Sequence, residues 1–199
     1  MATDYQQVLD FWFGDGADAE IASRQSSLWW GKNPEVDCQI KRQFEGDLQA
    51  LVDGQQPQWL ESPQGRLAAI VVLDQFSRNM YRDSGQSFSQ DGLALALCIE
   101  GIDRGVDKKL SPIQRVFFYM PLEHAESMDM QNLSVTAFER LHSEVPETDQ
   151  KLFAGFVEFA EKHRVIIERF GRYPHRNKLL GRESTAEEVE FLKQPGSRF

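Results

Sequence analysis

Three segments of the chain concentrate side chains that can bind an anion or transfer a proton. They cover residues 74–82, 123–126 and 172–182. Guanidinium groups offer a planar fork for a carboxylate or phosphate, and amide side chains can complete such a site. We therefore predict a pocket for a small anion or a peptide carboxylate where the segments meet. Its predicted lining is Trp30, Asp74, Gln75, Arg78, Asn79, Arg82, His124, Glu126, Arg172, His175, Arg176 and Asn177.

Two other functions and one structural role are compatible with the same side chains. In a hydrolase acting on a small anionic substrate, a carboxylate and a histidine would serve as general base and general acid. The candidate pairs are Asp74 or Glu126 with His124 or His175. A curved helical surface could instead be a scaffold for a protein partner. In the structural role, Glu123 and Glu126 would neutralise the arginines internally and the cluster would bind nothing.

A non-catalytic binding module is the function that we favour from the sequence. The chain has no glycine-rich phosphate loop, no G-x-S-x-G and no H-E-x-x-H motif, so no catalytic residue is assigned. No cofactor is predicted. A metal site would take His124, Glu126 and His175 as ligands, but no metal is predicted, because His124 and Glu126 are two residues apart and cannot face the same way on a regular helix. A kink at Pro121 would relax that objection.

The first polar segment comes at the end of a helix predicted over residues 63–82. Ser62 followed by Pro63 is a helix-start signal. Apolar residues surround the first half of this helix, which predicts that this half is buried. Asp74 and Arg78 have the i,i+4 spacing of an ion pair, so the polar groups should emerge from inside the protein.

Helical periodicity continues through the rest of the chain, and no alternating strand pattern of useful length is present. Ser111-Pro112 with Gln114 is a capping box, whereas Pro121 predicts a kink or break. The sequence therefore predicts one all-α domain over residues 1–199, with about eight or nine helices in antiparallel pairs. The predicted helices, with their cap residues, cover 4–13, 19–30, 33–54, 62–83, 90–104, 111–121, 132–142, 147–170 and 184–192.

Composition and charge argue against several partners. A net charge of -9 over 199 residues argues against binding to nucleic acids or to anionic membrane surfaces, because proteins that bind either one carry an excess of Lys and Arg. No apolar run approaches about 20 residues, and residues 1–7 have neither a basic start nor an apolar core, so no transmembrane or signal segment is expected. We therefore predict a cytoplasmic protein. Cys38 and Cys98 are isolated and fit neither a disulfide framework nor metal-ligand spacing.

Five blocks of residues carry a resemblance to a known family. They are FWFG at 11–14, WWG at 29–31, LDQFSRNMYR at 73–82, MPLEHAE at 120–126, and YPHRN at 173–177 with LGR at 180–182. In this order, and over nearly the whole chain, they resemble the signature of the bacterial domain-of-unknown-function 924 family. The resemblance implies a tetratricopeptide-like all-α fold of stacked helix pairs, in a right-handed array, and no established activity. The chain departs from the family pattern at Ser77, where proline is common, and at Ala125, where serine is common.

Overall fold

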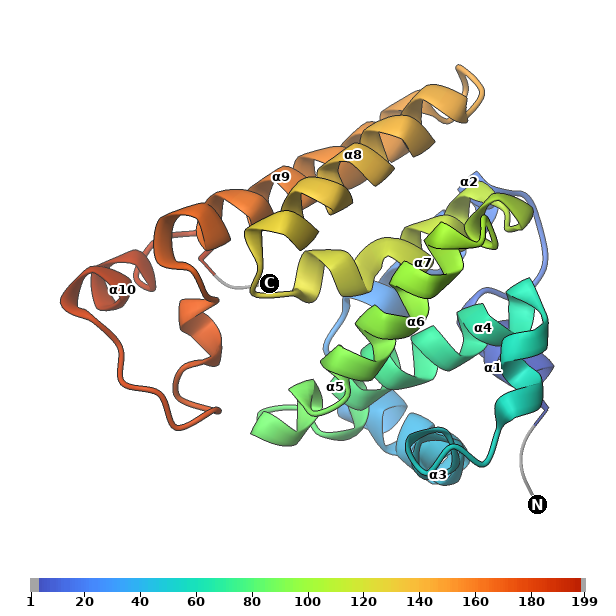
Figure 1. Cartoon of the computed structure of the whole chain (residues 1–199), viewed down its shortest axis with the longest axis horizontal. Coiled ribbons are helices and arrows are strands. Elements are labelled where there is room, and N and C mark those ends of the chain that lie inside the picture. Colours follow the sequence, from blue (N-terminus) through green and yellow to red (C-terminus); the bar gives the residue numbers. More distant parts are fainter. Residues whose placement is uncertain (1–3, 198–199) are drawn as a thin grey trace.

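The computed structural model describes residues 4–197, and this part of the chain consists of helices and short connections without strands (Figure 1). The prediction that residues 1–7 carry no signal segment falls partly on residues 1–3, which lie outside the described residues. Within residues 4–197, every helix is too short or too polar to cross a membrane. The α-helices are α1 (Tyr5–Trp12), α2 (Asp18–Trp30), α3 (Pro34–Val52), α4 (Pro63–Ile70), α5 (Ser77–Met80), α6 (Asp91–Asp103), α7 (Pro112–His124), α8 (Met128–Glu144), α9 (Gln150–Phe170) and α10 (Ala186–Phe191). Short 3-10 turns are η1 (Pro57–Glu61), η3 (Gly85–Phe88), η4 (Asp107–Lys109) and η5 (Pro174–Arg176).

The central helix of the chain is one continuous stretch with a local widening. A π-helical turn, η2 (Val71–Phe76), joins α4 to α5 without a break. When this stretch is counted once, the ten α segments make nine helices in the described residues. This confirms the predicted all-α class and the predicted number of helices. The right-handed stacking of helix pairs and the single-domain organisation stay predictions.

Helix starts follow from local side-chain chemistry. The Ser62 hydroxyl accepts a hydrogen bond from the backbone N–H of Gly65 at 3.0 Å at the start of α4. At the start of α7, the Gln114 side chain accepts a hydrogen bond from the backbone N–H of Ser111 at 3.2 Å. Both bonds satisfy N–H groups that the first turn of a helix leaves without a partner. Both of these starts agree with the sequence prediction.

Two helix ends differ from the prediction. α7 continues through Pro121 and ends at His124, so the helix does not break at the proline. Pro121 lies in the last turn of α7, where the missing backbone donor removes one hydrogen bond close to the end of the helix. α8 is longer than the predicted 132–142, because it begins at Met128 and ends at Glu144.

The α4–η2 stretch forms the centre of the core. α4 packs against α1, α6 and α7, and η2 packs against α3, α6 and α7. Every residue from 65 to 77 is buried, which confirms that the first half of the predicted helix is enclosed. Aromatic rings surround it, since the ring centre of Trp12 lies 5.4 Å from that of Phe76 and 5.6 Å from that of Phe117.

The C-terminal part of the chain returns to the central helix. α8 and α9 pack as an antiparallel pair along one side of the molecule (Figure 1), and α7 leads into this pair. Residues 171–182 then form a loop between α9 and α10, and this loop contains η5. This loop packs closely against Gly85, where an added Cβ would lie only 2.6 Å from the carbonyl oxygen of Leu179. The contact brings the third polar segment beside the chain that follows α5.

We expect that adding one methyl group at Gly101 of α6 destabilises the fold, because the residue is closely packed. A Cβ there would lie 2.4 Å from Cζ of the buried Phe118 ring and 3.1 Å from Cδ of Arg66. Gly101→Ala should therefore lower the free energy of unfolding by about 1–3 kcal/mol. The matched change Gly155→Ala in α9, where a Cβ meets nothing within 4 Å, should instead raise it by about 0.5–1 kcal/mol. Urea denaturation of both variants measures the difference, and equal effects would contradict the packing.

Candidate functional site

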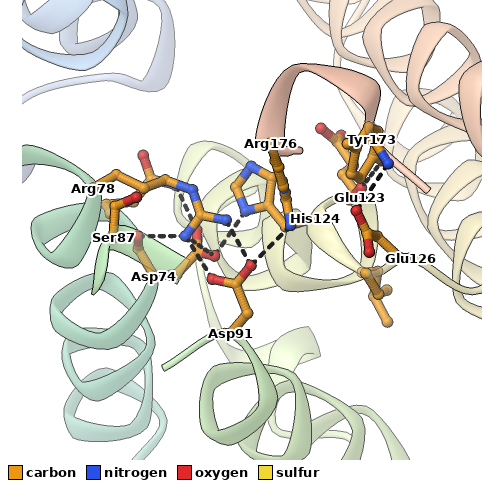
Figure 2. A network of polar contacts seen from close by, with 12 residues as sticks. Asp74, Arg78, Ser87, Asp91, Glu123, His124, Glu126, Tyr173 and Arg176 are labelled. Atoms are coloured by element: carbon orange, nitrogen blue, oxygen red, sulfur yellow. Dashed lines mark hydrogen bonds and ion pairs between the residues drawn. The ribbon is translucent and has the colours of Figure 1, made fainter. Parts of the chain in front are cut away.

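A cleft of about 440 Å³ opens where the end of α7, the start of α6 and the 171–182 loop meet. Three predicted site residues, His124, Glu126 and Arg176, are part of its lining. Two others, Asp74 and Arg78, belong to the polar network of Figure 2 that extends from the lining into the core. The full lining is Gly85, Phe88, Ser89, Asp91, Gly92, Leu95, Pro121, His124, Ala125, Glu126, Ser127, Arg176 and Leu180.

Asp74 is a fully buried carboxylate at the centre of this network. Its Oδ1 lies 2.7 Å from Nδ1 of His124 and 3.1 Å from Nη1 of Arg78. The amide of Gln75 donates to Oδ2 at 2.6 Å. Burial alone would raise the pKa of Asp74, but the charge of Arg78 and these hydrogen bonds hold it well below its usual value. Asp74 is therefore ionised throughout the physiological pH range.

The π-helical turn η2 carries Asp74 and its neighbour Gln75. It is wider than an α-helical turn because the N–H of Ser77 donates to the carbonyl of Val72, five residues earlier. Single π turns of this kind are rare in proteins, and many of those that occur lie at functional sites. Because the turn inserts an extra residue, positions after Ser77 are rotated relative to those before Val72. The predicted i,i+4 ion pair of Asp74 with Arg78 is nevertheless present, because Nη1 of Arg78 reaches Oδ1 of Asp74 across this one turn.

A chain of alternating charges links the central helix to the loop. Both terminal nitrogens of Arg78 donate to the Asp91 carboxylate, at 2.9 and 3.1 Å. Arg176 reaches the same carboxylate, with Nη1 at 3.2 Å from Oδ2. Bidentate guanidinium–carboxylate contacts of this kind fix orientation as well as charge. Asp91 thus connects α5 and η5 across the start of α6, as Figure 2 shows.

Arg176 packs against two aromatic rings. Its Cζ lies 4.6 Å from the ring centre of Phe88 and 4.6 Å from that of Tyr173. The residue is only 6% exposed. Burial, together with the nearby charge of Arg78, lowers the pKa of Arg176, although an arginine stays protonated in proteins. Asp91 therefore compensates the charge of Arg176 incompletely.

Glu126 and Gln131 form hydrogen bonds to the 171–182 loop, which contains Arg176. The Glu126 carboxylate accepts two hydrogen bonds from Arg182, at 2.6 and 2.9 Å, and one from the backbone N–H of Tyr173 at 2.8 Å. The buried amide of Gln131 donates to the Tyr173 hydroxyl at 2.9 Å and to the carbonyl oxygens of Glu123 and Ala125. These contacts tie the end of α7 to the loop. The position of Arg176 in the cleft depends on them.

His124 is the histidine that lines the cleft. Because Asp74 is ionised, Nδ1 of His124 carries the proton and donates it to Asp74. Burial and the charge of Arg78 lower the pKa of His124, while Asp74 opposes this effect. The ring is therefore neutral at pH 7, with the lone pair on Nε2. A buried carboxylate that fixes the tautomer of an imidazole is the arrangement that orients catalytic histidines.

A second, uncharged pair lies behind His124. Burial raises the pKa of Glu123 to about 8, and the charge of Asp74 adds to this effect. Burial also lowers the pKa of His163 to about 3. Nδ1 of His163 lies 3.6 Å from Glu123 Oε2 and donates to the Phe159 carbonyl at 2.8 Å. At pH 7 this pair is a neutral acid beside a neutral imidazole, so Glu123 does not neutralise the arginines.

Several predicted residues contact other parts of the protein. Arg82 donates to the Asp37 carboxylate of α3 at 2.6 and 2.8 Å, and Asn79 donates to the same group at 2.8 Å. Arg172 pairs with Glu188 of α10 at 2.7 and 2.9 Å. None of these three predicted residues is part of the cleft lining. The structure brings only part of the predicted set together.

The remaining predicted residues, Asn177, His175 and Trp30, also lie outside the lining. The Asn177 side chain accepts a hydrogen bond from Arg182 at 2.9 Å and so shapes the loop. The ring centre of His175 lies 5.6 Å from that of Tyr173. Trp30 stacks on Phe117, with ring centres 5.9 Å apart, and is half-exposed.

The sequence did not single out Asp91, Phe88 or Gln131. Asp91 is the first residue of α6, where an acidic side chain is expected simply to interact with the helix dipole. Its two arginine partners come from positions 13 and 85 residues away, and no local spacing shows such contacts. Gln131 lies on the buried side of α8. A polar residue within an apolar stripe was the one feature of the sequence that could have indicated its buried hydrogen bonds.

Within residues 4–197, no three His, Cys, Asp or Glu side chains gather closely enough to hold a metal ion. The two cysteines are free, with Cys38 exposed and Cys98 buried. What the fold and the site define is an all-helical protein whose centre is a buried, hydrogen-bonded charge network beside an open cleft.

The chain belongs to the family described as bacterial protein of unknown function (DUF924), whose model matches residues 8–196. It is similar to the solved structure of ATU0120, a protein of unknown function from Agrobacterium tumefaciens, with 33% sequence identity and a TM-score of 0.79. That similarity covers 95% of this chain and 96% of the other. No curated protein matches the chain. The predicted family membership is confirmed.

We expect His124 to titrate below the ordinary pKa of histidine. NMR of the ring nitrogens should show the Nδ1–H tautomer at pH 7, with protonation at a lower pH than in a model peptide. Asp74→Asn removes the charge that favours the imidazolium form, so it should lower the pKa of His124 further. A midpoint above the model-peptide value would show a charged His124–Asp74 pair and contradict the assignment.

We expect Glu123 to make stability fall with rising pH. Its folded-state pKa of about 8 lies above the unfolded value, so folding takes up a proton between about pH 4.5 and pH 8. Glu123→Gln should remove this slope and raise the free energy of unfolding at pH 7 by on the order of 1–3 kcal/mol. Glu126→Gln is the control of opposite sign, because its ion pair with Arg182 lowers the pKa of Glu126 against the effect of burial. Urea denaturation at several pH values separates the two variants, and a slope that persists in Glu123→Gln would refute the assignment.

Proposed function

We propose that the cleft binds a small anion through the guanidinium group of Arg176. The observation that carries this proposal is the state of Arg176, which lines the cleft, is only 6% exposed, and has few partners for its donors. Among residues 4–197 its Nε–H is buried without a hydrogen-bond partner, and Nη1 makes one contact of 3.2 Å. A buried donor left unpaired costs about 1–3 kcal/mol, which an anionic ligand would recover.

Arg78 is the contrasting case within the same network. Its guanidinium donates to both oxygens of Asp91 and to the Asp74 carbonyl at 2.8 Å. The charges of Asp74 and Asp91 raise the pKa of Arg78 against the effect of burial, whereas that of Arg176 is lowered. The donors of Arg78 are therefore occupied within the protein, whereas Arg176 has a donor without a partner among residues 4–197.

The remainder of the lining supports a ligand with an apolar body. Phe88, Leu95, Pro121 and Leu180 contribute apolar surface to the cleft. A volume of about 440 Å³ lies within the range of about 300–1,000 Å³ that small-molecule pockets occupy. A carboxylate on a ring or short aliphatic chain fits this combination better than an inorganic ion, because it uses both the charge and the apolar wall.

Calorimetric titration with benzoate tests this proposal. Arg176→Met should weaken binding by about 10-fold to 100-fold, since a hydrogen bond to a charged group contributes about 1.5–3 kcal/mol. Arg140→Met is the matched control, because Arg140 pairs with Glu144 at the far end of α8 and should leave the affinity unchanged. Equal affinity of Arg176→Met and wild type, or no binding by the wild type, would refute the proposal.

A further inference from the structure

The orientation of His124 leaves one ring nitrogen for a ligand. Nδ1 is committed to Asp74 at 2.7 Å, and Asp74 is fully buried and cannot turn away to solvent. Across residues 4–197, no hydrogen bond to Nε2 of His124 is formed. His124 lines the cleft together with Arg176, and its side chain keeps 15% exposure. A lone pair on a fixed imidazole thus belongs to the same cleft as the guanidinium.

His163, which packs against His124, is used differently. His163 donates its Nδ1 proton to the Phe159 carbonyl and is not part of the cleft lining. It packs edge-on against His124, with ring centres 6.1 Å apart. The two histidines therefore differ in two ways. Nδ1 of His124 contacts a carboxylate and that of His163 a backbone carbonyl, and of the two only His124 lines the cleft.

The charges in the chain of ion pairs that runs from Asp74 to Arg176 are balanced in number. Asp74 and Asp91 contribute two negative charges, and Arg78 and Arg176 contribute two positive charges. An imidazolium formed at His124 would be stabilised directly by Asp74 through Nδ1–H. A negative charge formed on the ligand would lie in the cleft that Arg176 lines. The site is thus arranged to separate a proton from a bound molecule and to hold both resulting charges.

We infer that His124 is a general base that removes a proton from a hydroxyl group on the acid bound by Arg176, with Asp74 as its positioning residue. This inference rests on the proposed anion site. In the step, the O–H bond of the ligand breaks, the proton passes to Nε2, and the electron pair stays on the ligand oxygen. Two ligand groups are required, a carboxylate for Arg176 and a hydroxyl for His124. The ligand class is therefore a small hydroxy acid with an apolar body, such as a hydroxybenzoate.

A chromophoric hydroxy acid makes the proton transfer visible. The probe is 4-hydroxy-3-nitrobenzoate, because its phenolate form absorbs visible light and its phenol form does not. At one pH unit below the midpoint of the free dye, about one tenth of the free dye is ionised. On saturation with wild-type protein, at least half of the bound dye should be ionised. The analogue 4-methoxy-3-nitrobenzoate has no such proton, and its binding by calorimetry reports whether the anion site is intact.

Two variants remove the base and its positioning residue separately. His124→Gln keeps a polar side chain of similar length but cannot take up the proton, so the bound dye should show no more phenolate than the free dye. Asp74→Asn keeps the shape of the buried side chain and should reduce the phenolate fraction in the same direction. Circular dichroism verifies that each variant is folded, and either variant alone is sufficient for the test.

The possible outcomes separate the two proposals. If the wild type binds both dyes and the bound phenol stays un-ionised, the general-base inference is overturned and the anion site survives. The general-base inference is likewise overturned if the folded variants ionise the dye as well as the wild type. If neither dye binds, both proposals fall. Binding of both dyes, with ionisation that is lost in the variants, supports both.

Discussion

The buried carboxylate of Asp74 is the constraint on which the rest of the structure depends. An ionised carboxylate without solvent is costly unless each of its oxygens has a partner. The partners here come from the next turn of the same helix, from Gln75 beside it and from the end of α7. Because Arg78 then engages Asp91, and Asp91 engages Arg176, this one charge determines the relative positions of α5, α6, α7 and the 171–182 loop.

Much of the fold could be predicted because its signals are local. The cap at Ser62, the capping box at Ser111 and the apolar run before Asp74 each act within one or two turns, and each is present in the structure. The i,i+4 contact of Asp74 with Arg78 is local for the same reason. The end of α7 was harder to predict, because the effect of Pro121 depends on how near the helix end lies.

The candidate site was predicted only in part, because its decisive contacts are tertiary. Sequence reasoning treated Arg78, Arg82 and Arg172 as equivalent cations, yet each has a different carboxylate partner, on α6, α3 and α10 respectively. No spacing rule distinguishes an arginine with a complete set of partners from one without. Nor could the sequence show that Glu123 is a neutral acid, since its raised pKa comes from burial and from a charge 49 positions away, at Asp74.

The packing of the 171–182 loop against Gly85 also bears on the order in which the protein is made and folded. Asp74, Arg78 and Asp91 leave the ribosome well before Arg176, which pairs with Asp91 across 85 residues of sequence. Contacts of such long separation form late, since the intervening chain must first be ordered. During synthesis, a nascent chain ending before Arg176 would hold Asp91 and Phe88 at an open edge of the cleft. Residues 171–182 therefore close the cleft only after the helices that carry Asp74, Arg78 and Asp91 have been made.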